Sequence, residues 1–174
     1  KKLSINMQNS IKSQIKINNA SKIKIGVVQA TFNSDITDAM VQDLKSKANE
    51  YGIKSENIKV VQVPGAVEIP LLLQTMCQAN LEDMEYDREP SYDVLVVIGC
   101  VIQGDTPHFD YVCKAVTDGV LQLNLTLDSP VIFGVLTLEN EQQALERIGG
   151  IHGHKGEESA ITAIKMIALN RKLK

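Results

Sequence analysis

The chain has 174 residues, of which 44% are hydrophobic and 22% are charged. These proportions exclude a collagen, a coiled coil and a disordered chain, and the length fits one domain with a single core. The longest apolar run, at residues 94–102, spans nine residues. A membrane-spanning helix needs about 20, so we expect no membrane partner.

The net charge of −3 is unevenly distributed along the chain. Residues before Ile25 include six lysines and no acidic residue, so the remaining 12 basic residues face all 21 acidic ones. We expect residues 1–22 to form a flexible tail and residues 23–174 to form a single domain. Because this domain is acidic, it lacks the basic face that nucleic-acid binding needs.

The tail and the cysteines indicate the compartment. The absence of acidic residues in the tail also fits the remnant of a transit segment. Cys77, Cys100 and Cys113 form no CxxC pair and cannot all be bridged, which favours a reducing compartment. We therefore predict a cytoplasmic protein, with a plastid-like organelle after transit-peptide removal as the alternative.

Strands and helices alternate after the tail. The predicted strands are residues 23–28, 58–63, 92–98 and 131–136. The predicted helices are residues 34–51, 66–78, 107–125, 139–148 and 157–169, and the polar segment 81–91 is predicted to be a surface loop. The third strand is apolar throughout, as a strand buried on both faces requires. We predict an α/β fold, a three-layer sandwich with a four-stranded parallel sheet in a flavodoxin-like arrangement, with helices on both faces.

Ligands of open α/β sheets bind at the carboxyl ends of the strands. This rule selects four segments, at residues 30–33, 64–68, 100–108 and 133–137. Phe32 is one of only three phenylalanines, and it either stacks on a flat ligand ring or packs against the following helix. Glu68 is either a first-turn acid that compensates the helix dipole or an acceptor for the hydroxyl groups of a polyol.

The segment 104–110 predicts an anion site at the start of a helix. Thr106 suits the N-cap position and Pro107 suits the first helical position. Gly104 lets a phosphate approach the backbone, whose free N–H groups bind anions. His108 would lie beside that anion, where opposed effects on its charge suit a proton shuttle. The alternative is a capped helix start with a surface histidine.

One cation precedes the glycine-rich stretch at residues 149–156 and a second lies within it. Arg147, in the last turn of a predicted helix, is either a phosphate clamp or a compensating charge for the helix dipole. Lys155 is either a donor to a ligand or a solvated loop charge. His152 and His154 have an i, i+2 spacing, but no third ligand type lies nearby in sequence, so no metal site is predicted.

Three motifs in a fixed order carry a specific resemblance. They are VPGAVEIP at residues 63–70, GDTPHFDYV at residues 104–112 and PVIFGVLT at residues 130–137, followed by Glu141, Gln142, Ala144, Arg147, Gly149 and residues 153–156. Together, over about residues 23 to 170, they closely resemble the family of 6,7-dimethyl-8-ribityllumazine synthases.

The resemblance implies a transferase of riboflavin biosynthesis that acts at the penultimate step. It condenses 5-amino-6-ribitylamino-2,4(1H,3H)-pyrimidinedione with 3,4-dihydroxy-2-butanone 4-phosphate to 6,7-dimethyl-8-ribityllumazine, and it releases phosphate and water. Because the substrate supplies the amine, no cofactor is expected. The resemblance also implies a homo-oligomer built on pentamers, some of which form decamers or sixty-subunit shells, and a functional link to riboflavin synthase. We expect tail residues 13–17 to add a strand to the sheet edge of a neighbour.

The resemblance also implies a role for individual residues. Those expected to bind the pyrimidinedione substrate are Phe32, Asn33, Ala66, Val67, Glu68, Cys100, Val101, Ile102, Phe133 and Lys155. Among them Phe32 stacks on the ring, residues 66–68 line the ribityl chain, residues 100–102 border the ring, and Phe133 comes from the neighbouring protomer. Those expected to bind phosphate are Gly104, Asp105, Thr106 and Arg147. His108 is expected to be the catalytic residue that transfers protons.

Some positions depart from the family pattern. Val67 stands where many members carry an aromatic residue, which predicts a looser cavity wall. Gln103 and Ile151 replace common basic residues, which weakens the positive field around the phosphate. His154 replaces a frequent Asn, and Pro107 replaces a frequent Thr or Met.

Two other functions are alternatives to the enzyme. An electron-transfer module would share the fold, but it needs a Ser/Thr/Gly-rich phosphate loop after the first strand, and residues 30–34 contain no glycine. A non-catalytic shell or ligand-binding protein derived from the enzyme is the other. The presence of His108 and Arg147 argues against it.

Overall fold

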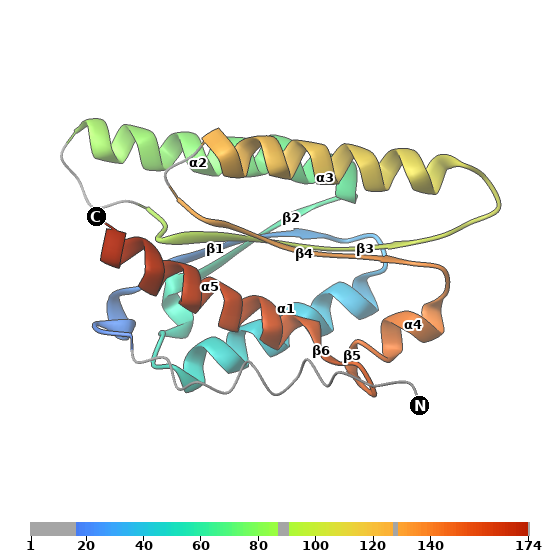
Figure 1. Ribbon diagram of the computed structural model, residues 1–174, viewed down its shortest axis with the longest axis horizontal. Coiled ribbons are helices and arrows are strands. Elements are labelled where there is room, and N and C mark those ends of the chain that lie inside the picture. Colours follow the sequence, from blue (N-terminus) through green and yellow to red (C-terminus); the bar gives the residue numbers. More distant parts are fainter. Residues whose placement is uncertain (1–16, 87–90, 127–128, 174) are drawn as a thin grey trace, which may run out of the picture.

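The computed structural model describes residues 17–86, 91–126 and 129–173. The strands of the main sheet are β1 (Ile25–Ala30), β2 (Ile58–Val63), β3 (Val94–Ile102) and β4 (Val131–Leu138). The helices are α1 (Ser34–Glu50), α2 (Ile69–Glu85), α3 (His108–Thr126), α4 (Glu141–Leu145) and α5 (Lys155–Leu173), with 3-10 turns η2 (Ala20–Lys22), η3 (Ser55–Asn57) and η4 (Ala66–Glu68). The four strands are parallel in the order β2-β1-β3-β4, which confirms the predicted fold (Figure 1).

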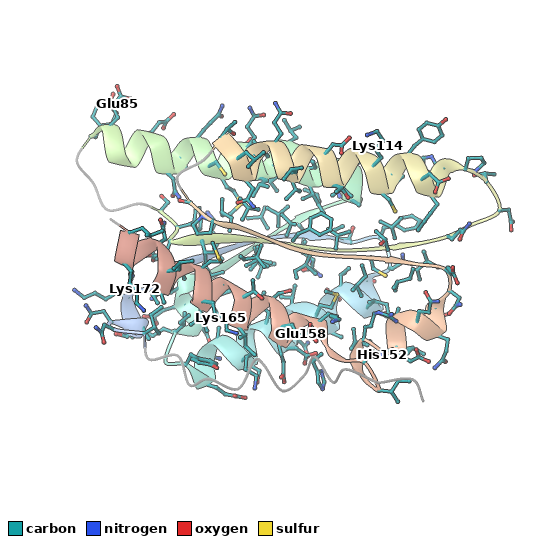
Figure 2. All side chains as sticks on the ribbon, viewed as in Figure 1. Glu85, Lys114, His152, Glu158, Lys165 and Lys172 are labelled. Carbon is teal, nitrogen blue, oxygen red and sulfur yellow. The ribbon has the colours of Figure 1, made fainter. Side chains whose placement is uncertain are left out.

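Helices cover both faces of the sheet (Figure 1). Alternate strand residues belong to two separate cores, because successive side chains of a strand point to opposite faces. Val94 and Val96 of β3 pack with α1 and α5, whereas Leu95 and Val97 pack with α2 and α3. All of these side chains are fully buried. Figure 2 shows that labelled charged side chains lie on the outer helical surfaces, such as Lys114 on α3.

Several predicted boundaries were wrong. β3 extends to Ile102, so residues 100–102 lie on the strand rather than in a loop, because β4 pairs with them along their whole length. Helix α2 continues to Glu85, into the segment predicted to be a loop. The predicted helix at residues 139–148 is limited to the short α4, which begins where the Asn140 side chain accepts a hydrogen bond from Gln143 N at 3.0 Å.

A small hairpin replaces the end of that helix and the glycine-rich loop that was expected to follow. Strands β5 (Ile148–Gly150) and β6 (Gly153–His154) pair antiparallel. Gly149 and Gly153 adopt φ angles of +119° and +79°, which favour glycine. Arg147 therefore precedes the hairpin instead of ending a helix, and Lys155 opens α5 instead of lying in a loop.

The expected tail lies mostly outside the described residues. Of the segment 13–17, which we expect to add a strand to a neighbour, only Ile17 is described, and it packs against the core between the sheet and α1 and α5. Among the described helices, none has both the length and the apolar character needed to cross a membrane.

Helices α1 and α5 lie in close contact on the lower face of the sheet in Figure 1, and this contact sets their separation. Gly156, in the first turn of α5, is buried against the backbone of α1. A β-carbon added at this glycine would overlap the carbonyl oxygen of Met40 and lie 2.8 Å from its carbonyl carbon. Since the obstacle is backbone rather than a flexible side chain, a larger residue forces the two helices apart.

We predict that Gly156→Ala lowers the free energy of unfolding by about 1–3 kcal/mol, the usual cost of inserting a methyl group into a packed core. Chemical denaturation followed by circular dichroism measures it, at one protein concentration for all variants. The matched control is Gly104→Ala, because an added methyl group there meets no atom within 4 Å. Equal denaturation midpoints for the two variants would contradict the prediction.

Candidate active site

A cavity of about 560 Å³ opens at the carboxyl edge of the sheet, between the ends of β1, β2 and β3 and the start of α3. Its lining residues are Phe32, Asn33, Gly65, Val67, Glu68, Cys100, Val101, Ile102, Gly104, Thr106, His108, Phe109 and Val112. Three of the four segments selected by the strand-end rule therefore meet in one place. Most of the wall is apolar, with a few polar groups, as is usual for small-molecule sites.

The loop after β1 is held against the neighbouring strands. Phe32 N donates to the carbonyl oxygen of Pro64 at 3.0 Å, and Asn33 Nδ2 donates to the carbonyl oxygen of Cys100 at 2.9 Å. Asn33 adopts a left-handed backbone conformation with φ +58°, which asparagine tolerates. With its backbone fixed in this way, the Phe32 side chain is 72% exposed on the cavity rim. This exposure argues against packing of the ring on α1, and its stacking on a ligand stays a prediction.

The loop after β2 presents a carboxylate of fixed position. Glu68 Oε2 accepts a hydrogen bond from Gly65 N at 2.9 Å, which closes the loop on itself. The Glu68 side chain is exposed and lines the cavity, as does the neighbouring Val67, which is 48% exposed. Ala66, in contrast, is buried beneath them in the core and does not line the cavity.

The residues of the predicted anion site lie at the start of α3, and their anion-binding role stays a prediction. Thr106 Oγ1 accepts a hydrogen bond from His108 N at 3.4 Å, and Pro107 O accepts one from Asp110 N at 3.0 Å. The whole stretch from Gly104 to His108 is exposed, and Gly104, Thr106 and His108 line the cavity. Asp105 lies in this stretch without lining the cavity through its side chain.

Cys100 lines the cavity, but its thiol is not a reactive group. Its side chain is 3% exposed, and burial raises the pKa of its thiol to about 11. The thiol therefore stays protonated at neutral pH, where only a thiolate acts as a strong nucleophile. The described cysteines Cys77 and Cys113 are also free thiols, and burial raises the pKa of both.

Besides Ala66 and Asp105, three of the expected site residues do not line this cavity. These are Phe133, Lys155 and Arg147. Phe133 and Lys155 line a second cavity of about 490 Å³ along β4 and α5. The Phe133 side chain is 43% exposed, and Lys155 Nζ pairs with Glu158 Oε2 at 2.7 Å. Arg147 lines neither cavity, and its Nη1 donates to the carbonyl oxygen of Gln143 at 2.8 Å. Within one chain, Phe133, Lys155 and Arg147 therefore do not line the cavity that contains His108.

Sequence reasoning missed three cavity residues. Gly65 was part of a quoted motif but received no role. Phe109 and Val112 project from the first turns of α3 into the same cavity as His108. Residues three and four apart share a helix face. The i, i+4 spacing of His108 and Val112 was therefore a signal that could have found one of them.

An open parallel sheet carries at its carboxyl edge an apolar cavity, a fixed carboxylate, an imidazole and an exposed helix start. This combination defines a flavodoxin-like α/β protein with a small-molecule site.

Comparison with known proteins specifies the family. The family model for 6,7-dimethyl-8-ribityllumazine synthase matches residues 22–171. The chain is 42% identical to the 6,7-dimethyl-8-ribityllumazine synthase of Parabacteroides distasonis over 148 residues, which cover 85% of this chain and 86% of that protein. For the synthases of Bacteroides fragilis and Bdellovibrio bacteriovorus, identity is 45% and 47%, with 83% and 87% of this chain and 94% and 78% of those proteins covered.

The chain belongs to the 6,7-dimethyl-8-ribityllumazine synthase family, and it is an enzyme of riboflavin biosynthesis. The resemblance drawn from the three motifs is confirmed. The comparisons favour the enzyme over the electron-transfer alternative.

We predict that Cys100→Ala keeps turnover within about twofold of the unchanged enzyme, because the protonated thiol offers no nucleophile at neutral pH. The variant should lose about 1 kcal/mol of stability through the small cavity that it leaves. Steady-state formation of the lumazine chromophore measures the first effect and chemical denaturation the second. A loss of turnover beyond tenfold in a folded variant would show that the thiol takes part in the reaction.

Proposed function

We propose that the chain condenses 5-amino-6-ribitylamino-2,4(1H,3H)-pyrimidinedione with 3,4-dihydroxy-2-butanone 4-phosphate in a site shared between two protomers. The product is 6,7-dimethyl-8-ribityllumazine, and phosphate and water are released. The observation that carries this proposal is that residues from three separate strand-end segments, 30–33, 64–68 and 100–108, line one cavity. An amine of the pyrimidinedione attacks the ketone, so the reacting nitrogen comes from the substrate.

One half of the site is the cavity itself. The exposed ring of Phe32 offers a flat surface for the pyrimidinedione, with Asn33 and residues 100–102 beside it. The Glu68 carboxylate, held by Gly65 N, accepts hydrogen bonds from the ribityl hydroxyls, and Val67 completes that wall. Gly104, the N–H of Asp105 and Thr106 bind the phosphate at the exposed start of α3.

The other half lies on a second protomer. None of the described residues that line the cavity is Lys or Arg, whereas a phosphate dianion in an apolar setting needs a cationic partner. Arg147 and Lys155 carry such charges, and Phe133 beside Lys155 is an exposed aromatic ring. In a second copy of the chain these groups face the cavity: Arg147 pairs with the phosphate, Lys155 approaches a pyrimidine carbonyl, and Phe133 covers the ring.

The β4 edge supports association of copies. β4 is an outer strand of the sheet. The helix beside it, α5, carries the exposed apolar residues Met166 and Leu169, and Met166 lines the same cavity as Phe133. Exposed edges flanked by apolar side chains favour contact with another chain. We propose a homo-oligomer built on pentamers, and we propose that its product is passed to riboflavin synthase.

Within this site the rate comes mainly from alignment of two bound reagents. His108 moves protons between the amine, the carbinolamine and the leaving groups, while the phosphate contacts hold the ketone beside the amine. Holding two reactants in place removes much of the entropic part of the barrier. A general acid or base adds a further factor.

We predict that the unchanged protein forms the lumazine chromophore from the two substrates, and that His108→Ala lowers turnover by about 10- to 100-fold without abolishing it. The control is His152→Ala, an exposed imidazole outside the cavity. Binding of inorganic phosphate, measured by calorimetry, should persist in both variants. Complete loss of turnover with intact substrate binding would refute alignment as the main source of rate. A folded protein that makes no chromophore would refute the proposed function.

We also predict that two inactive variants restore each other. Glu68→Ala damages the cavity half and Arg147→Ala damages the other half, so a mixed oligomer regains intact sites where the two types meet. At equal amounts and random order, about one interface in four is intact. Sequential purification through two different affinity tags isolates the mixed oligomer for the chromophore assay.

The matched control mixes the unchanged chain with the double variant Glu68→Ala/Arg147→Ala. That mixture also contains about one intact interface in four under the same random order. The two mixed oligomers should therefore show equal activity. If the first mixture is no more active than its separate components while the control is active, each chain holds a complete site and the shared site is refuted.

A further inference from the structure

The hairpin formed by β5 and β6 holds the two cations Arg147 and Lys155 together. Lys155 N donates to the carbonyl oxygen of Arg147 at 2.9 Å, directly beside the paired residues Ile148 and His154. Any shift of the hairpin therefore moves both cations at once. What holds the hairpin in place consequently decides where the two charges lie.

His154 ties the hairpin to α1. Its Nδ1 lies 3.0 Å from Asp43 Oδ2, with the His154 side chain 41% exposed and the Asp43 side chain 27% exposed. One turn earlier on α1, Met40 contacts Gly156. Two consecutive turns of α1 thus contact the segment at residues 154–156, and Lys155 lies between the two contacting residues, His154 and Gly156.

The hairpin backbone is shaped to admit the imidazole. A β-carbon added at Gly149 would lie 2.8 Å from Cε1 of His154, and the φ of +119° at Gly149 favours glycine. The His154 ring therefore lies against bare backbone of the opposite strand while its Nδ1 faces Asp43. This geometry leaves the ring little freedom, and a fixed ring fixes the strand that carries it.

We propose that the contact between His154 and Asp43 positions Arg147 and Lys155 for the phosphate-bearing substrate, a role that rests on the proposed function of those two cations. His154 does not touch substrate and acts through the hairpin. A charge-assisted hydrogen bond to phosphate weakens when its donor moves, because its strength depends on distance and angle. Loss of this contact weakens the binding of phosphate groups more than it slows a bound substrate.

The test compares His154→Ala, Asp43→Ala and the double variant with the unchanged enzyme. Each single variant should raise the KM for the butanone phosphate and the Kd for inorganic phosphate by about 5- to 20-fold, the effect of one weakened charge-assisted hydrogen bond, with kcat changed less than about threefold. The double variant should be no worse than either single one, because all three lose the same contact.

Two conservative variants separate positioning from packing. Asn carries its amide nitrogen on the γ-carbon, as histidine carries Nδ1, so His154→Asn should restore the KM. Gln carries its nitrogen one atom further out, so His154→Gln should not. The matched stability control is Lys47→Ala, which removes a 3.4 Å ion pair between α1 and Glu157 of α5 without touching the hairpin. It should leave the KM unchanged.

Three results would overturn the positioning role: an unchanged KM and phosphate Kd in His154→Ala, an equal defect in His154→Asn, or an equal rise in KM in Lys47→Ala. Failure of the proposed function looks different. In that case the unchanged protein makes no lumazine, and Arg147→Ala binds inorganic phosphate as well as the unchanged protein does. Phosphate binding is measured without turnover, so the two failures are distinguishable.

Discussion

The site depends on the pairing of β1 with β3 at the centre of the sheet. The chain runs outward from β1 to β2 and returns across β1 to β3. The helix after β1 packs on one face and the helix after β3 on the other. The two connections therefore diverge and leave a crevice, the usual ligand position in such sheets. Asn33 spans it by donating to the Cys100 carbonyl oxygen, so the cavity residues are placed relative to this crossing.

The sheet and the cavity were largely predictable because both follow from local patterns. The continuous apolar run of β3 requires burial on two faces, and parallel strands bring their carboxyl ends together. Phe32, Glu68 and His108 follow three different strands, so they meet at that edge. The prediction required only strand positions and the rule that ligands bind at strand ends.

The hairpin was not predictable from its own residues. Residues 139–148 have helical spacing, and a helix is the local preference there. Pairing of Ile148 with His154 instead depends on the left-handed glycines and on the support from α1, which is more than a hundred residues away in sequence. Contacts so distant override local preference. For the same reason no local signal placed Arg147 and Lys155 beside each other, although both were candidates.

The separation of charges links ligand binding to assembly. The cavity contains the Glu68 carboxylate and no described Lys or Arg, so a phosphate dianion bound there would lack a cationic partner from the same chain. In the proposed shared site, a neighbour supplies the missing cation, and the bound phosphate then contacts both protomers. A ligand that binds only the assembled form stabilises that form by its binding free energy. Because such linkage is reciprocal, a more stable interface between protomers also raises the affinity for phosphate. If Arg147 and Lys155 have the proposed roles, the position of the hairpin beside them affects both phosphate binding and assembly.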